Sequence, residues 1–310
     1  MDIILIFHVM LMAIVQGIAE FLPISSSGHL IVLGHFFNLE DVFLLSILLH
    51  AGTLLSVLVF FYRELVDACV YRPRIIGLVI WGTIPTVVLA FTVQKFLPWI
   101  ETSLWVTGCG FLATAFLLMT VMRRNSRTFD EEYYEKIAYE EEGLEAPVAK
   151  TGETTSWLDA FIVGLVQGIA VIPGLSRSGS TISAGVMRRF SNEWAAEFSF
   201  FLSIPVIAGG AALEIIKEVK EVGLENISTL FSVTSAFPIY LGGAFVSFIV
   251  GWISLYYLMQ MLKAGKLHYF AVWLIFAGLF TLGLCAYENW DQLLQFMTQS
   301  SSSAQGPGGV

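Results

Sequence analysis

Eight apolar segments, most of them long enough to cross a bilayer, limit what this chain can fold into. A transmembrane helix needs about 20 apolar residues. Six of the segments are continuous, and two are interrupted by polar residues, glycine and proline. Only 13% of the 310 residues are charged, which is too few to cover the surface of a soluble protein. The pattern predicts an all-α integral membrane protein with six transmembrane helices, at 42–62, 75–98, 103–122, 195–216, 231–260 and 268–287.

The two interrupted segments, 3–37 and 158–187, are interpreted as re-entrant helical hairpins that enter and leave the membrane on the same side. Glycine and proline end helices, and non-helical backbone at membrane depth is tolerated only where protein or water covers it. With the N-terminus outside, this topology places 12 of the 16 Lys and Arg residues on cytoplasmic loops, as the positive-inside rule requires. We therefore expect a multi-pass protein of the plasma membrane, with both termini outside and a cleft facing outward.

The two interrupted segments also repeat each other. The sequence VQGIAEFLPISSSG at 15–28 matches VQGIAVIPGLSRSG at 166–179, at a constant offset of 151 residues. Three full spans separate the copies, so the second copy is upside down, and inverted-topology repeats place their sites near the midplane. We expect a single membrane domain over 1–310, which comprises a first inverted repeat at 1–122, an acidic cytoplasmic loop at 123–156, a second inverted repeat at 157–290 and a flexible tail at 291–310.

Polar residues gather at the two hairpin tips, at the depth of the bilayer core. A charged side chain there costs at least about 2.5–3.5 kcal/mol and usually has both a partner and a function. An ion pair between Glu20 and Arg177 that only locks the hairpins together is the structural alternative, but it leaves the many hydroxyl groups unexplained. The first tip contains Gln16, Glu20, Ser25, Ser26, Ser27, Gly28 and His29, and the second contains Gln167, Ser176, Arg177, Ser178, Gly179, Ser180 and Thr181.

These residue types favour chemistry on a phosphate group carried by a lipid. The planar guanidinium of Arg177 fits phosphate oxygens, and a Ser/Gly-rich tip at the start of a helix offers N–H groups to an anion. A histidine such as His29, beside a hydroxyl and a carboxylate, is typical of acid–base or nucleophilic catalysis. A polyprenyl-phosphate flippase or an anion transporter is the rival, because inverted repeats with broken helices are typical of transporters. The position of His29 beside serines favours an enzyme.

Three motifs carry a family resemblance: QGIAE at 16–20, PISSSGH at 23–29 and PGLSRSGST at 173–181. With them the chain resembles the undecaprenyl-diphosphate phosphatases, or bacitracin-resistance phosphatases, over nearly its whole length except 124–156 and the tail. The resemblance implies hydrolysis of undecaprenyl or another polyprenyl diphosphate to the monophosphate, which recycles the lipid carrier for cell-wall synthesis. The partners are then this lipid substrate and membrane lipid, with a homodimer left open. No nucleic acid is expected, because the sequence has no basic patch.

The resemblance also implies roles for individual residues. The catalytic set is Glu20, Ser26, His29 and Arg177, and the nucleophile stays open among Ser26, His29 and water. Gln16 stands where the family has Glu or Gln and cannot act as a base, so Glu20 becomes the essential acid. A divalent cation, Mg²⁺ or Ca²⁺, is implied with Glu20 as its ligand. The remaining assignments are phosphate binding by Ser25, Ser27, Ser176, Ser178, Gly179, Ser180 and Thr181, and support by Gln16 and Gln167.

Two polar residues within the span 42–62, His50 and Thr53, are predicted to pack between helices rather than to take part in the reaction. The three cysteines, at 69, 109 and 285, lack the spacing of metal ligands and are expected to be structural or incidental.

Overall fold

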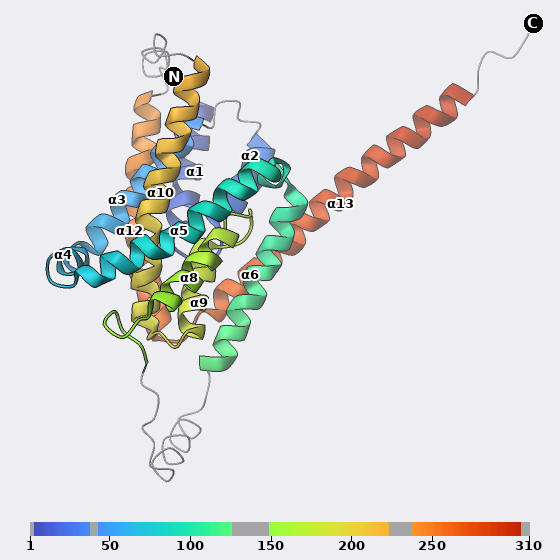
Figure 1. The fold of residues 1–310 in the computed structure, drawn as a ribbon. Helices are drawn as coiled ribbons and strands as arrows, with labels where there is room; N and C mark the ends of the chain where they lie inside the picture. The colour runs from blue at the N-terminus through green and yellow to red at the C-terminus, as the bar shows by residue number, and fades with distance from the viewer. Residues whose placement is uncertain (1–2, 38–42, 126–148, 223–236, 305–310) are drawn as a thin grey trace, which may run out of the picture.

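The computed structural model describes residues 3–37, 43–125, 149–222 and 237–304, and its regular elements in these ranges are all helices (Figure 1). The all-α prediction is therefore confirmed for the described part of the chain. The helices are α1 (Ile3–Ala19), α2 (Ser26–Phe37), α3 (Phe43–Phe60), α4 (Tyr62–Val70), α5 (Pro73–Phe96), the short 3₁₀ helix η1 (Pro98–Thr102), α6 (Leu104–Asn125), α8 (Trp157–Ile169), α9 (Arg177–Met187), α10 (Asn192–Val222), α12 (Phe237–Lys263) and α13 (His268–Ala304).

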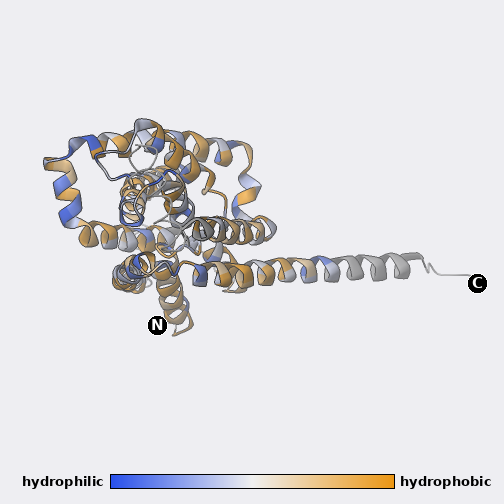
Figure 2. Cartoon of the chain, turned by 90° about the horizontal axis from the view of Figure 1, so that it is seen from below, coloured by the Kyte–Doolittle hydropathy of each residue, from blue (hydrophilic) through white to orange (hydrophobic). Residues whose placement is uncertain are grey.

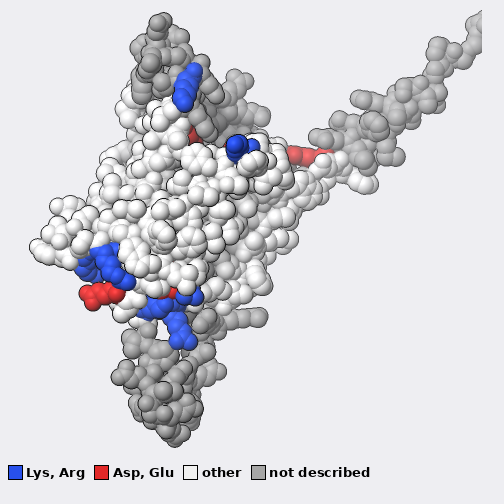
Figure 3. Space-filling view, in the orientation of Figure 1, with Lys and Arg blue, Asp and Glu red and all other residues white. Residues whose placement is uncertain are grey.

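Five helices in the described ranges, α5, α6, α10, α12 and α13, are long and apolar enough to cross a bilayer. A sixth candidate is α3 together with α4, although the pair is bent by 69°. At most 44% of the most apolar window of each of the five helices is buried inside the protein, so much of their apolar surface is exposed. Figure 2 shows that hydrophobic residues predominate along the helices. Charged side chains gather at opposite ends of the molecule, with an uncharged band between them (Figure 3). This is the surface of a multi-pass membrane protein.

Two helix pairs, α1–α2 and α8–α9, are shorter than the helices that could span a membrane. Their members have 17, 12, 13 and 11 residues, fewer than the roughly 20 that a span requires. The turns that join them touch: Ser178 donates a hydrogen bond to the carbonyl of Leu22 (3.3 Å), and a Cβ atom at Gly179 would lie 3.1 Å from Pro23. The two turns that carry the repeated motifs therefore meet inside the protein.

Glycine allows each short pair to lie close against a long helix. A Cβ atom at Gly164 of α8 would collide with the carbonyl of Gly82 on α5. A Cβ atom at Gly17 of α1 would lie 2.9 Å from the carbonyl of Ser247 on α12. Small residues are the usual means by which helices approach closely in membranes, where helix–helix contact has no hydrophobic driving force. These close contacts pack α8 against α5 and α1 against α12.

Part of the predicted acidic loop, residues 149–156, packs against the protein rather than standing in solvent. Asp159, on the first turn of α8, is completely buried and pairs with Lys150 (2.6 Å) and Arg188 (2.6 Å). Thr155 accepts a hydrogen bond from the indole of Trp194 (2.8 Å). A buried carboxylate must be paired, and here Lys150 is drawn in from the loop to pair with it. Residues 126–148 of this predicted loop lie outside the described residues.

Two predicted boundaries differ from the structure. Residues 63–70, expected to be part of a cytoplasmic loop after the span 42–62, belong to helix α4 (Tyr62–Val70). Helix α13 continues to Ala304, although a flexible tail was expected from residue 291. The sequence between Gly283 and Gly306 contains no glycine or proline, so nothing in it stops a helix at 290.

Candidate active site

The local sequence explains how each hairpin turn presents its polar residues. Ser25 adopts a left-handed backbone conformation (φ 70°), and its hydroxyl accepts a hydrogen bond from the N–H of Gly28 (3.3 Å). Ser176 caps α9 in the same way, by accepting from the N–H of Gly179 (3.1 Å). The helix that follows each cap begins at Ser26 or Arg177, so these residues project from the two turns.

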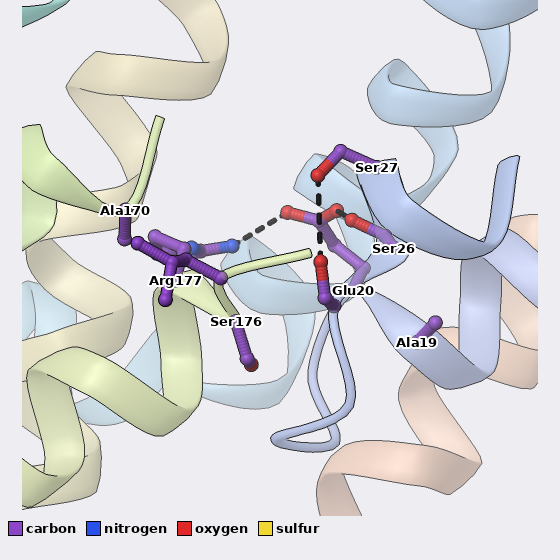
Figure 4. Close-up of a pocket in the computed structure, with 9 residues that line it drawn as sticks. Ala19, Glu20, Ser26, Ser27, Ala170, Ser176 and Arg177 are labelled. Atoms are coloured by element: carbon purple, nitrogen blue, oxygen red, sulfur yellow. Dashed lines mark hydrogen bonds and ion pairs between the residues drawn. The ribbon is translucent and has the colours of Figure 1, made fainter. Parts of the chain in front are cut away.

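Glu20 is the centre of the site (Figure 4). One carboxylate oxygen accepts hydrogen bonds from Ser26 Oγ (2.7 Å) and Gln16 Nε2 (3.1 Å), and the other accepts from Arg177 Nη2 (2.5 Å). Only 7% of Glu20 is exposed, so both charges of the Glu20–Arg177 pair are largely removed from solvent. The acid and the hydroxyl come from the first turn and the guanidinium from the second, as the repeat predicted.

Two buried polar atoms next to this pair lack a hydrogen-bond partner among the described residues. They are Nη1 of Arg177, which is a donor, and Oε1 of Gln16, which is an acceptor. Buried polar atoms nearly always have partners, so this donor and this acceptor indicate a place where a bound molecule belongs. The Arg177 side chain lines a cavity of about 40 Å³, together with Glu20, Ser25, Ser26, Ser27, Ser176 and three apolar residues.

The Glu20–Arg177 ion pair forms part of the wall of this small cavity. Its volume of about 40 Å³ is enough for a few water molecules but not for a diphosphate. Ser27, on its rim, is exposed. A diphosphate would therefore have to approach past Ser27 and take over the guanidinium that now binds Glu20.

His29 lies to one side of this cluster. Its Nδ1 hydrogen-bonds the carbonyl of Ser25 (2.8 Å), and its Nε2 accepts from the indole N–H of Trp273 on α13 (3.0 Å). Its ring meets that of Phe111 edge to face, with centroids 5.0 Å apart. The structure thus brings Glu20, Ser26 and Arg177 together, whereas the hydrogen bonds of His29 go elsewhere.

Several residues predicted to bind phosphate have protein partners instead. Ser176 and Ser178 are within hydrogen-bond distance of each other (3.2 Å), and Thr181 donates to the carbonyl of Arg177 (2.8 Å). Ser180 is buried. Gln167, expected to support the site, donates to Thr86 on α5 (3.2 Å) and so ties α8 to α5. The phosphate-binding role of these residues remains a prediction.

Two neighbours of the site were missed from the sequence. His50, predicted to pack between helices, has its Nε2 3.9 Å from the carboxylate of Glu20. The signal was present, because an ionisable residue within an apolar span is a functional candidate by default. Trp273 carried no such signal, since its contact with His29 joins residues 244 positions apart.

The described residues do not form a metal site by themselves. No cluster of three or more His, Cys, Asp or Glu side chains that could hold a metal is found in the described ranges. Glu20 is the one carboxylate of the cavity, and it already accepts three hydrogen bonds. A divalent cation would need most of its oxygen ligands from elsewhere.

The fold and the site together define a multi-pass helical membrane protein with a buried Glu–Ser–Arg cluster. The chain belongs to the family described as bacitracin resistance protein BacA, whose model matches residues 9–280. It is 38% identical over 273 residues to an undecaprenyl-diphosphatase of Rhodopirellula baltica, covering 88% of this chain and 95% of that relative. The undecaprenyl-diphosphatase of Treponema denticola is 36% identical over 291 residues, covering 91% and 97%. That of Carboxydothermus hydrogenoformans is 34% identical over 275 residues, covering 87% and 94%. The resemblance read from the motifs is confirmed.

Proposed function

We propose that this protein is an integral membrane phosphatase that hydrolyses undecaprenyl diphosphate to the monophosphate and inorganic phosphate. Membership of the BacA family and the names of the relatives support this activity. The structural observation that carries it is the buried Nη1 of Arg177, which lacks a partner among the described residues and belongs to a side chain lining the cavity. The reaction returns the lipid carrier to cell-wall synthesis.

The geometry supports a route through Ser26. Arg177 exchanges Glu20 for the terminal phosphate and offsets the charge that develops during transfer. Ser26 Oγ attacks phosphorus while Glu20, already 2.7 Å away, accepts its proton. The bond to the bridging oxygen breaks, and the lipid monophosphate leaves. Water then hydrolyses the phosphoserine. Attack by His29, or by water directly, remains the alternative.

Two neighbouring serines provide a matched test of this route. Ser26 donates to Glu20, whereas the hydroxyl of Ser27 is within hydrogen-bond distance only of that of Ser25 (3.4 Å) among the residues the structure describes. We expect Ser26→Ala to lower phosphate release by a factor of about 10³ or more, and Ser27→Ala by less than about 10. A quenched reaction of the wild type should yield phosphate on Ser26. Acid-labile phosphate on His29, or equal losses in the two variants, would contradict the route.

The flippase and the transporter are the rivals. Either would bind the diphosphate at the same guanidinium without cleaving it, and the names of the relatives favour cleavage. The decisive assay is release of inorganic phosphate from undecaprenyl diphosphate by the purified protein in detergent. Binding without release would support the rivals.

We also propose that Mg²⁺ or Ca²⁺ enters the site with the substrate. Diphosphate oxygens would supply most of its ligands, and Glu20 is the carboxylate that the cavity lining adds. EDTA should then abolish phosphate release, and added Mg²⁺ should restore it. EDTA should leave the melting temperature of the substrate-free protein unchanged, because the described residues hold no preformed metal site.

For the topology, we propose six spans and two re-entrant hairpins in an inverted repeat of the plasma membrane, with both termini and the cleft on the outer side. The starts of α2 and α9 support this, since Ser26 and Arg177 are 151 positions apart, the offset of the sequence repeat. The inverted repeat is also supported by matching contacts, since the first helix of each short pair packs against a long helix: α1 against α12, and α8 against α5.

A further inference from the structure

Both ring nitrogens of His29 are occupied in a way that fixes its tautomer. The indole N–H of Trp273 can only donate, so Nε2 of His29 must carry a free electron pair. The proton therefore lies on Nδ1, which donates it to the carbonyl of Ser25. This hydrogen-bond network assigns a neutral imidazole whose remaining reactive nitrogen is covered by the indole.

This arrangement holds His29 out of the reaction. Nε2 is the nitrogen that could accept a proton or meet a phosphate, and it can do neither while the indole N–H occupies it. The hydroxyl of Ser26 meanwhile donates to Glu20 rather than to the imidazole. In the route through Ser26, Nε2 of His29 can take the proton of the water that hydrolyses the phosphoserine while the lipid monophosphate is still bound, and Trp273 has to move before it can do so.

Trp273 is placed where an apolar ligand can move it. It lies on the membrane-facing side of α13 and is 52% exposed, with its ring nearly parallel to that of His29 (10°, centroids 6.0 Å apart). Beside it is a pocket of about 290 Å³ formed by α1, α2, α6 and α13. Its lining includes Val32, Leu33, Phe276 and Phe280, and His29 supplies the polar end. A hydrocarbon chain in this pocket would contact the indole and the imidazole together.

We propose that Trp273 is a positioning residue that covers Nε2 of His29 until the isoprenoid chain of the substrate fills this pocket and displaces the indole. The inference rests on the proposed function, because it needs a lipid diphosphate as the substrate. It makes the availability of His29 depend on the length of the hydrocarbon chain. A short chain would bring the phosphate to Arg177 and leave His29 covered.

Kinetics with two chain lengths test this coupling. Trp273→Phe keeps an aromatic ring in the pocket and removes the N–H, and Trp252→Phe, a similarly exposed tryptophan on α12, is the matched control. A net hydrogen bond is worth a factor of about 2–10, so Trp273→Phe should raise kcat for farnesyl diphosphate, measured from the substrate-bound state, by about that factor. For undecaprenyl diphosphate the change should be under about twofold. Trp252→Phe should change neither value.

An equal change for both substrates in Trp273→Phe, or no change for either, would overturn the proposal. If the wild type cleaved neither substrate, the proposed function itself would fail, and a second measurement still decides the state of His29.

That measurement is the ¹⁵N NMR spectrum of protein labelled at histidine, with His29→Ala identifying the signal. The wild type should show Nδ1 protonated and Nε2 accepting a hydrogen bond, and Trp273→Phe should lose the hydrogen-bond shift at Nε2. Adding undecaprenyl monophosphate to the wild type should produce the same loss, and farnesyl monophosphate should not. Identical spectra for the wild type and Trp273→Phe would refute the contact, and no response to the long-chain lipid would refute its displacement.

Discussion

At the scale of single residues, the two sequence copies share their turn chemistry and differ in their reactive groups. Ser25 and Ser176 occupy equivalent positions, and the hydroxyl of each accepts a hydrogen bond from the N–H three residues later. At the same offset, Glu20 corresponds to Val171 and Ser26 to Arg177. One copy therefore supplies the acid and the hydroxyl, and the other supplies the cation.

Arg177→Lys keeps the positive charge but loses the planar fork, since lysine cannot bind a phosphate through two parallel N–H groups. We expect kcat/KM for undecaprenyl diphosphate to fall by a factor of about 10² or more. The control is Arg63→Lys, which makes the same change at an exposed residue at the start of α4. Wild-type activity in Arg177→Lys would show that the pair only holds the hairpins together.

The sequence predicted part of this site because the repeat relates its two halves. A repeat read from 15–28 and 166–179 was enough to expect Glu20 near Arg177. The sequence did not predict the orientation of the His29 side chain. That orientation depends on which face α13 turns toward α2, and apolar helices in a membrane show no pattern that fixes their rotation.

At the scale of helices, close crossings at glycine hold the hairpins in place. Gly164→Ala would force α8 away from α5, because the new methyl group meets the carbonyl of Gly82. Overpacking of this kind costs about 1–3 kcal/mol, so we expect the melting temperature in detergent to fall by about 2–6 °C.

Gly209→Ala on α10 is the matched control, since a Cβ atom there meets nothing within 4 Å. Its melting temperature should be unchanged or slightly higher, because alanine favours a helix over glycine. Equal melting temperatures for the two variants would mean that α8 and α5 are not packed as described.

Helix positions were predictable where the sequence is apolar and continuous, as at α5 and α12. The helix at α4 was not predicted, because its sequence is polar. The C-terminal end of α13 was predicted too early, because the polar composition after residue 290 suggested a tail although no glycine or proline stops the helix there. Polar composition alone does not distinguish a loop from an exposed helix.

At the scale of the whole molecule, the proposed topology makes opposite predictions for two exposed residues. Glu101 in η1 should face outward, and Lys266, between α12 and α13, should face the cytoplasm. In a background without the native cysteines, a membrane-impermeant maleimide should label Glu101→Cys in intact cells. It should label Lys266→Cys only after the cells are permeabilised. The reverse pattern would overturn the orientation.

The meeting of the two turns has a consequence for synthesis. Glu20 is made early, and Arg177 is added only after more than half of the chain has been synthesised. Until then Glu20 has no Arg177 to pair with, and the guanidinium that we propose binds the diphosphate is missing. A truncated or half-inserted product is thus inert toward the lipid pool, and activity begins only when the later turn has reached the earlier one.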